Sequence, residues 1–177
     1  MKIPICTFCA QTGMLCSDCQ KKLDSGEITP LDITISKIAV EFEKKNPEAA
    51  NVTLIDIIDY PDLVVIIVES GESRFLQGKQ ASFAEQIEQE IHRSVKIVEK
   101  IGNTKKLIRM IFAPAKITGI NTVFVPVRSA KPGQSSIEEE LTVVIKKEDK
   151  DLLPSKLSNL KDLVKNLTGE EIRTTFR

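Results

Sequence analysis

The sequence predicts an α+β protein in which a four-cysteine metal-binding segment precedes two copies of one αββααβ unit. Three observations support this prediction. All four cysteines lie within the first nineteen residues, as two C-x2-C pairs. The rest of the chain alternates between helical and strand spacing of apolar residues, in the same order twice. The apolar positions of the two halves also superpose at a constant offset of 77 residues. We therefore expect a metal-binding segment at 1–28 and two domains at 29–101 and 102–177.

The first pair of cysteines is Cys6 and Cys9, and the second is Cys16 and Cys19. Four thiolates at this spacing complete the tetrahedral shell of one structural Zn²⁺ and leave no position for water or substrate. Metal binding would also supply folding free energy that so short a segment cannot obtain from a core. The short gap between the pairs predicts a compact knuckle, with Gly13 helping the chain to turn.

Two alternatives to zinc can be weighed. Two disulfides would use the same residues, but the chain has no later cysteine and no export signal ahead of the cluster. Iron in the same four-thiolate cage stays open.

The first repeat begins with a helix that Thr29-Pro30 starts and Asn46-Pro47 ends, because threonine caps helices and proline favours their first position. A capping box of Ser82 and Glu85 starts a later helix. The predicted elements are, in order, a helix from 30 to about 45, strands at 52–58 and 63–68, a helical turn at 74–76, a helix at 83–91 and a strand at 95–98.

The second repeat shows the same order of elements, and Gly169 closes its last helix. The predicted elements are a helix at 104–112, strands at 117–127 and 141–146, a helical turn at 149–153, a helix that includes 160–167 and ends at 168, and a strand at 172–176. Residues 129–137 are predicted to form a polar loop.

The offset of 77 residues holds without a gap from the second strand onward. Val64 falls on Leu141, and Val95 falls on Ile172. Further apolar pairs at the same offset are Ile66 and Val143, Val68 and Ile145, Leu76 and Leu153, Phe83 and Leu160, and Ile87 and Val164. A constant offset across three elements indicates a duplicated domain.

The composition argues against several classes of protein. No apolar stretch is long enough to cross a membrane, and the first residues lack a hydrophobic signal core, so we expect a cytoplasmic protein. His92 is the only histidine, and no nucleophile–base arrangement can be assembled with it. The chain also lacks a phosphate-binding loop of the G-x-x-x-x-G-K-[ST] type. We therefore expect neither an enzyme nor a small-molecule substrate.

The two halves differ in net charge. Residues 31–100 contain 8 Lys or Arg and 13 Asp or Glu, whereas residues 101–177 contain 14 and 9. The basic C-terminal half is the better candidate for contact with phosphate. Differences of this size are also common on soluble domains.

The order of elements resembles that of type II KH domains, which bind single-stranded nucleic acid through a loop between two consecutive helices. Two such domains in tandem resemble the archaeal NusA-like proteins, relatives of the transcription factor NusA. The resemblance covers about residues 31–177 and is closest in the runs LIRMIFAPAK (107–116), INTVFVP (120–126) and LTGEEIR (167–173). It implies two KH folds, RNA as a partner and a role in transcription.

The binding loop of that family is Gly-x-x-Gly, in which glycine lets phosphates approach the backbone. The first loop here, Gly78-Lys79-Gln80-Ala81, keeps one glycine, and the second, Ser155-Lys156-Leu157-Ser158, keeps neither. Both keep a lysine in the second place. The resemblance implies a nucleic-acid-binding role for these residues and their basic neighbours: Gly78, Lys79, Gln80, Ser155, Lys156, Lys146, Lys147, Lys150 and Lys161.

Two functions follow from these observations. One is an RNA-binding factor that works with degenerate loops. The other is an adaptor whose KH folds and zinc knuckle dock on RNA polymerase or the ribosome. A nucleic-acid binder should lose affinity steeply with salt, whereas an adaptor should depend on zinc.

Overall fold

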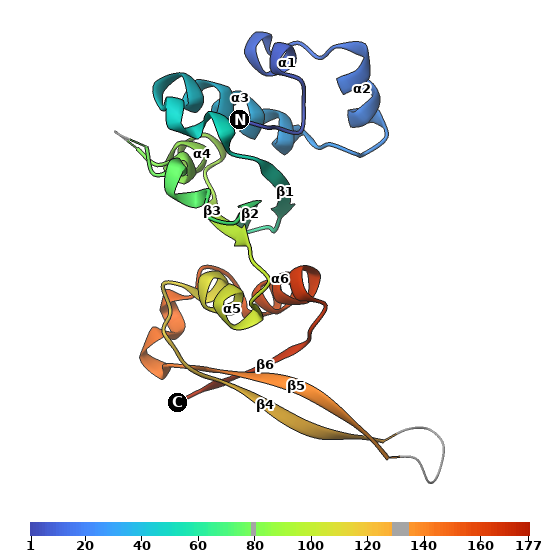
Figure 1. Ribbon diagram of the computed structural model, residues 1–177, viewed down its shortest axis with the longest axis vertical. Helices are drawn as coiled ribbons and strands as arrows, with labels where there is room; N and C mark the ends of the chain where they lie inside the picture. Colours follow the sequence, from blue (N-terminus) through green and yellow to red (C-terminus); the bar gives the residue numbers. More distant parts are fainter. Residues whose placement is uncertain (79–80, 129–134) are drawn as a thin grey trace. The chain divides into compact units, whose positions relative to one another are not determined.

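The computed structural model of the chain describes residues 1–78, 81–128 and 135–177 and shows an α+β architecture with two three-stranded mixed sheets (Figure 1). The chain divides into two compact units, Met1–Ile101 and Gly102–Arg177. Each unit contains one sheet and its own helices. Together they form the tandem KH-like repeat that the sequence predicts, preceded by a four-cysteine cluster.

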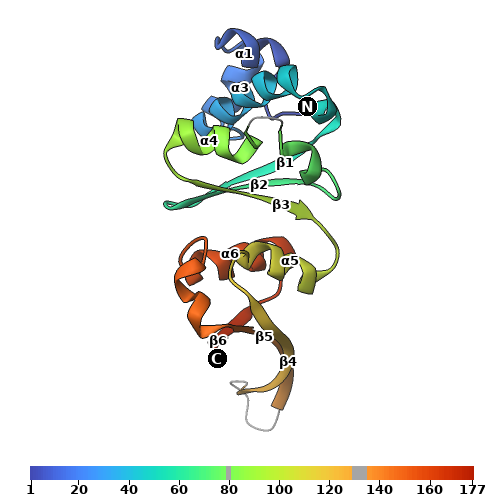
Figure 2. The same ribbon diagram turned by 90° about the vertical axis from the view of Figure 1, so that its left-hand side faces the viewer.

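The first unit places α3 and α4 on one face of its sheet (Figure 2). Their inward residues, among them Ile35, Phe42 and Phe83, form one core with Val64 and Ile66 of the sheet. The elements of this unit are α1 (Thr7–Thr12), α2 (Ser17–Asp24), α3 (Pro30–Lys45), η1 (Pro47–Asn51), β1 (Leu54–Asp59), β2 (Leu63–Glu69), η2 (Ser73–Leu76), α4 (Phe83–Ile91) and β3 (Ser94–Lys100).

Capping boxes start two helices of this unit, α3 and α4. The Thr29 side chain accepts a hydrogen bond from the Asp32 N–H, and the Asp32 carboxylate accepts one from the Thr29 N–H. Ser82 and Glu85 form the same reciprocal pair at the start of α4. Each box satisfies backbone donors that the first turn of a helix leaves without partners.

The second unit repeats the arrangement. Its helices pack against each other, and the buried residues of α5 include Ile108 and Phe112, while those of α6 include Leu160 and Val164. The elements are α5 (Thr104–Phe112), β4 (Ile117–Arg128), β5 (Ser135–Ile145), η3 (Lys147–Leu152), α6 (Leu157–Thr168) and β6 (Ile172–Phe176).

The two sheets have the same topology. In each, the first two strands are antiparallel and the third lies parallel to the second, in the orders β1-β2-β3 and β4-β5-β6. Val64 pairs with Val95 in the first sheet, and Leu141 pairs with Ile172 in the second. Residues that are 77 positions apart in the sequence therefore occupy the same pairing position in the two sheets.

The metal-binding segment packs on the outer side of α3. Ile5, Cys9, Cys19 and Ile28 share a small apolar cluster with Val40 of that helix. A parallel bridge between Lys2 and Thr53 joins the start of the chain to the residue that directly precedes β1. The cluster and the first repeat consequently belong to one compact unit.

One predicted boundary is wrong. The predicted polar loop extends to residue 137 and the strand after it starts at 141, but β5 begins at Ser135 and runs through the acidic residues to Ile145. The rest of the predicted loop, 129–134, lies outside the described residues. Residues 135–140 of β5 pair with the second half of β4, from Val123 to Arg128. Cross-strand pairing outweighs the polar composition of this stretch.

None of the helices in the described part of the chain is long and apolar enough to span a membrane.

Candidate functional site

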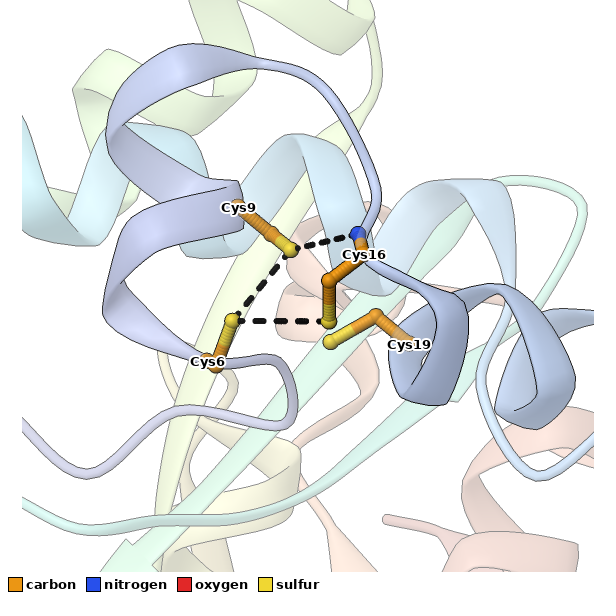
Figure 3. A group of neighbouring side chains, drawn as sticks. All are labelled: Cys6, Cys9, Cys16 and Cys19. Carbon is orange, nitrogen blue, oxygen red and sulfur yellow. Dashed lines mark hydrogen bonds between the residues drawn. The ribbon is translucent and has the colours of Figure 1, made fainter.

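The four cysteine sulfurs converge on one point between α1 and α2 (Figure 3). All four lie within 4.8 Å of one another. The Cys6 sulfur lies 3.2 Å from that of Cys9 and 4.0 Å from that of Cys16. A disulfide would need about 2.05 Å, so the thiols are free, which goes against the two-disulfide alternative.

Each pair occupies the start of a short helix. Cys6 is the N-cap of α1, Cys16 is the N-cap of α2, and the second cysteine of each pair lies in the following turn. This places both sulfurs of a pair at the same helix end. Between the pairs, Gly13 caps α1 with a φ of +75°, a conformation that L side chains rarely adopt. The predicted turn at Gly13 is thus present.

Backbone N–H groups surround the sulfurs. The Cys16 N–H donates to the Cys9 sulfur at 3.0 Å. The pKa of Cys16 is lowered to about 7, first because the Cys19 N–H donates to its sulfur and then because of the neighbouring thiols. The N–H of Cys16 lowers the pKa of Cys9, but burial and three neighbouring thiols raise it to about 12. The Cys16 thiol is therefore far more acidic than the Cys9 thiol, which holds its proton at neutral pH in the absence of a metal ion.

The donor set fits a metal ion. Sulfur ligands at about 2.3 Å from a tetrahedral zinc ion lie about 3.8 Å apart, close to the spacing seen here. Cys9 and Cys19 are buried, Cys16 is half-buried and Cys6 is exposed. Within the part of the chain that the structure describes, the cluster consists of these four cysteines without a histidine or carboxylate. Four thiols of this geometry can hold one ion in a closed shell.

The first KH-like loop lies between η2 and α4. Gly78 has a φ of +67°, and a Cβ at this position would lie 2.1 Å from the Ala81 carbonyl oxygen and 3.0 Å from the Phe42 ring. Only glycine fits this close approach of the backbone. Lys79 and Gln80 lie outside the described residues.

The second loop lies between η3 and α6 and is built differently. The Ser155 side chain is 9% exposed, and its hydroxyl accepts a hydrogen bond from the Asn159 amide at 3.0 Å. Lys156 is exposed and is the N-cap of α6. The loop is therefore folded onto the helix through its first residue, and its lysine faces solvent.

The basic neighbours fall into two groups. Lys146, Lys147 and Lys150 are exposed residues in or next to η3, and Lys161 is half-buried in α6. Lys146 forms an ion pair with Glu148 at 2.5 Å, which raises the pKa of the lysine. An ion pair of this kind competes with phosphate for the ammonium group. Sequence spacing alone does not indicate this ion pair, because it depends on the conformation of the chain at η3.

The outer surface of the knuckle carries two exposed apolar side chains that the sequence did not single out. Phe8 and Met14 are 61% and 68% exposed, and α3 places Lys37 and Lys44 next to α1. Exposure depends on which helix faces pack inward, so the cysteine spacing contained no signal for it.

No protein-family model matches the sequence, and the curated proteins contain no match. Among solved structures, the chain is similar to the crystal structure of the archaeal protein APE1850. The identity is 16%, the alignment covers 80% of this chain and 96% of that chain, and the TM-score is 0.48.

Proposed function

We propose that this protein is an RNA-binding factor of the NusA-like KH type, which works in transcription or on another RNA-containing machine. The observation that supports it best is the paired loop architecture. Each repeat places a short lysine-containing loop between two helical elements. The first loop also keeps the one glycine that its backbone requires. Type II KH domains contact the backbone of single-stranded nucleic acid from this place in the fold.

The four thiols hold one structural Zn²⁺ in this proposal. Cys6, Cys9, Cys16 and Cys19 would be its ligands, and the ion would supply folding free energy rather than chemistry. Because Cys9 and Cys19 share an apolar cluster with Val40, the ion would also fix the knuckle against α3.

The test is the salt dependence of RNA binding by the full chain. A labelled single-stranded oligoribonucleotide is titrated by fluorescence anisotropy at several salt concentrations. Removing one phosphate contact should reduce the slope of log K against log salt by about 0.7. We expect this change for Lys79→Glu and Lys156→Glu. The control is Lys105→Glu, because Lys105 is exposed in α5 and lies outside both loops. A wild-type chain without measurable affinity for RNA would refute the proposal.

A second candidate is an adaptor that docks on RNA polymerase or the ribosome. The observation in its favour is the second loop, where Ser155 bonds to Asn159 and no glycine remains for a phosphate to approach. Affinity purification of the tagged protein with and without nuclease distinguishes the two. Protein subunits retained after nuclease support the adaptor, whereas RNA lost with nuclease supports direct binding.

A further inference from the structure

The first strands of the two repeats differ in charge at the edge of their sheets. In the orders β1-β2-β3 and β4-β5-β6, both β1 and β4 are edge strands. β1 has six residues and contains Asp56 and Asp59. β4 has twelve residues, and none of residues 117–127 is charged. Because β3 and β6 also contain charged residues, β4 is the one edge of the two described sheets without a charge before its last residue, Arg128.

Only the two ends of β4 are protected against pairing with another strand. The unpaired N–H and C=O groups of an edge strand can bond to another chain, and proteins prevent this with charges, short strands, bulges or proline. The register of β4 shifts between Ile117 and Gly119, and Pro126, which lacks an N–H, lies near the other end. The stretch between them, residues 119–125, has no bulge, proline or charge.

Every second residue of this stretch directs its backbone groups to the open edge. The Arg177 N–H donates to the Ile145 carbonyl, so Ile145 faces β6. Because direction alternates along a strand, Thr142 faces β4, and its partner Asn121 faces β5. Pro126, which has no N–H to give to β5, falls among the outward-facing positions. The other outward-facing residues of this stretch are Ile120, Thr122 and Phe124.

The side chains of the stretch are also open to solvent. Val123 and Phe124 are 43% and 63% exposed, and they lie on opposite faces of the sheet because successive side chains alternate. Asn121 and Thr122 are exposed as well. Since β6 pairs only with residues 141–145, β4 and β5 continue beyond it as two strands, as Figure 1 shows. The edge of β4 is therefore open in the second unit as the structure describes it.

A second copy of β4 is complementary to this edge. In an antiparallel pair about a two-fold axis at Thr122, the outward N–H and C=O groups of each Thr122 bond to the other copy. Phe124 then lies beside Ile120 of the partner subunit and covers an apolar side chain at the edge of the core. The acidic β5 strands of the two copies are about 14 Å apart, three strand spacings, which exceeds the Debye length of about 8 Å.

We propose that the edge of β4, residues 119–125, is the surface through which two copies of this chain form a symmetric dimer. The two three-stranded sheets then become one continuous sheet. The contact between two strand edges is smaller than the standard interface of about 1,600 Å², so the dimer forms at micromolar and higher concentrations. This inference goes beyond the proposed RNA-binding function and does not depend on it.

Sedimentation velocity of the zinc-loaded full chain, over a series of micromolar concentrations, measures the dimer. Thr122→Lys places two ammonium groups opposite each other and should abolish it. Thr175→Lys is the matched control, because Thr175 is an exposed threonine on the other edge strand, β6. Phe124→Ala should weaken the dimer about ten-fold, since two cross-strand pairs are lost. An equimolar mixture of Thr122→Lys and Thr122→Glu should dimerise again, because opposite charges then meet at the axis.

Circular dichroism and zinc content establish that each variant is folded. A wild type that stays monomeric at every concentration overturns the proposal, and an uncharged extended segment of another protein becomes the candidate for this edge. A dimer that Thr122→Lys does not disrupt also overturns it, because the contact then lies elsewhere. If the two charge variants stay monomeric when mixed, the two-fold pairing at Thr122 is wrong. RNA affinity is measured separately, so failure of this proposal and failure of RNA binding are distinguishable.

Discussion

The backbone N–H of Cys16 donates a hydrogen bond to the sulfur of Cys9 at 3.0 Å and so joins the two C-x2-C pairs through the main chain. The bond comes from the residue that begins α2 and ends on a residue in the first turn of α1. Short helices of this kind are marginal in water without tertiary support. The stability of the whole segment should therefore depend on what the four sulfurs hold.

The first prediction concerns metal removal. Cys9→Ser should lose tightly bound zinc, because a structural site needs all four thiolates. Amide exchange should then rise across residues 5–28 and along the side of α3 that contains Val40, while β4, β5 and β6 stay protected. Hydrogen–deuterium exchange by mass spectrometry measures this, with Ser17→Ala as the control in α2. Loss of protection throughout the chain would show that the second unit depends on the metal.

Acidification, like the Cys9→Ser substitution, should weaken zinc binding. The thiols must lose their protons to bind the ion, and the pKa of Cys9 without metal is about 12. Zinc affinity should therefore fall as the pH falls, which a competition titration with a chelator measures. Affinity that is independent of pH would mean that these thiols are not the ligands.

The second prediction concerns Gly78. Gly78→Ala combines a left-handed φ of +67° with a contact of 2.1 Å to the Ala81 carbonyl oxygen. We expect it to lower the free energy of unfolding by about 1–3 kcal/mol. Gly71→Ala is a matched control, because Gly71 has a φ of +82° but open space around it. Urea denaturation compares them. An equal loss at both positions would mean that backbone strain alone, without the contact, accounts for the effect.

The duplication could be predicted from the sequence in detail. Val64 and Leu141 differ by 77 positions, and their partners Val95 and Ile172 differ by the same number. Apolar periodicity was sufficient here because the residues that face the helices determine strand register. Caps were also predictable, since Thr29 and Ser82 satisfy local donors with local side chains.

Features that depend on distant contacts could not be predicted. The start of β5 at Ser135 depends on pairing with Arg128, and the bridge from Lys2 to Thr53 joins residues far apart in sequence. The outward and inward faces of α1 and α2 also depend on distant contacts, because packing against α3 decides them. The cysteine spacing predicted a compact knuckle but did not indicate that Phe8 and Met14 face outward.

The third prediction concerns Ser36 in α3. Its side chain is completely buried, and among the described residues its hydroxyl has no hydrogen-bond partner. A buried polar group without a partner costs about 1–3 kcal/mol. Ser36→Ala should therefore raise the free energy of unfolding by about 1 kcal/mol, measured by urea denaturation. Thr34→Ala is the control for helix propensity, because the Thr34 hydroxyl does have a partner, the Pro30 carbonyl. If Ser36→Ala instead lowers the free energy of unfolding, the Ser36 hydroxyl forms a stabilising hydrogen bond and the prediction is wrong.

The fourth prediction concerns the pH dependence of stability through Glu99. The Ser73 hydroxyl donates to the Glu99 carboxylate at 2.5 Å, and this bond, with the N–H groups of Gly71 and Ser73, lowers the pKa of the carboxyl from its ordinary value of 4.5. Because folding lowers this pKa, the ionised carboxylate stabilises the fold above pH 4.5, and the stabilisation is lost as the pH falls through the folded-state value. Glu99→Gln should thus lower the free energy of unfolding by about 1 kcal/mol at pH 7.

The difference between the wild type and Glu99→Gln should shrink as the pH falls below 4.5, because protonation then removes the same charge from the wild type. Thermal unfolding of both chains across this range measures it, with Glu90→Gln as an exposed control on α4. Since Glu99 joins β3 to the start of η2, the element before Gly78, the same titration should loosen the first loop. Amide exchange near Gly78 that stays constant while global stability falls would show that the loop is held independently of this carboxylate.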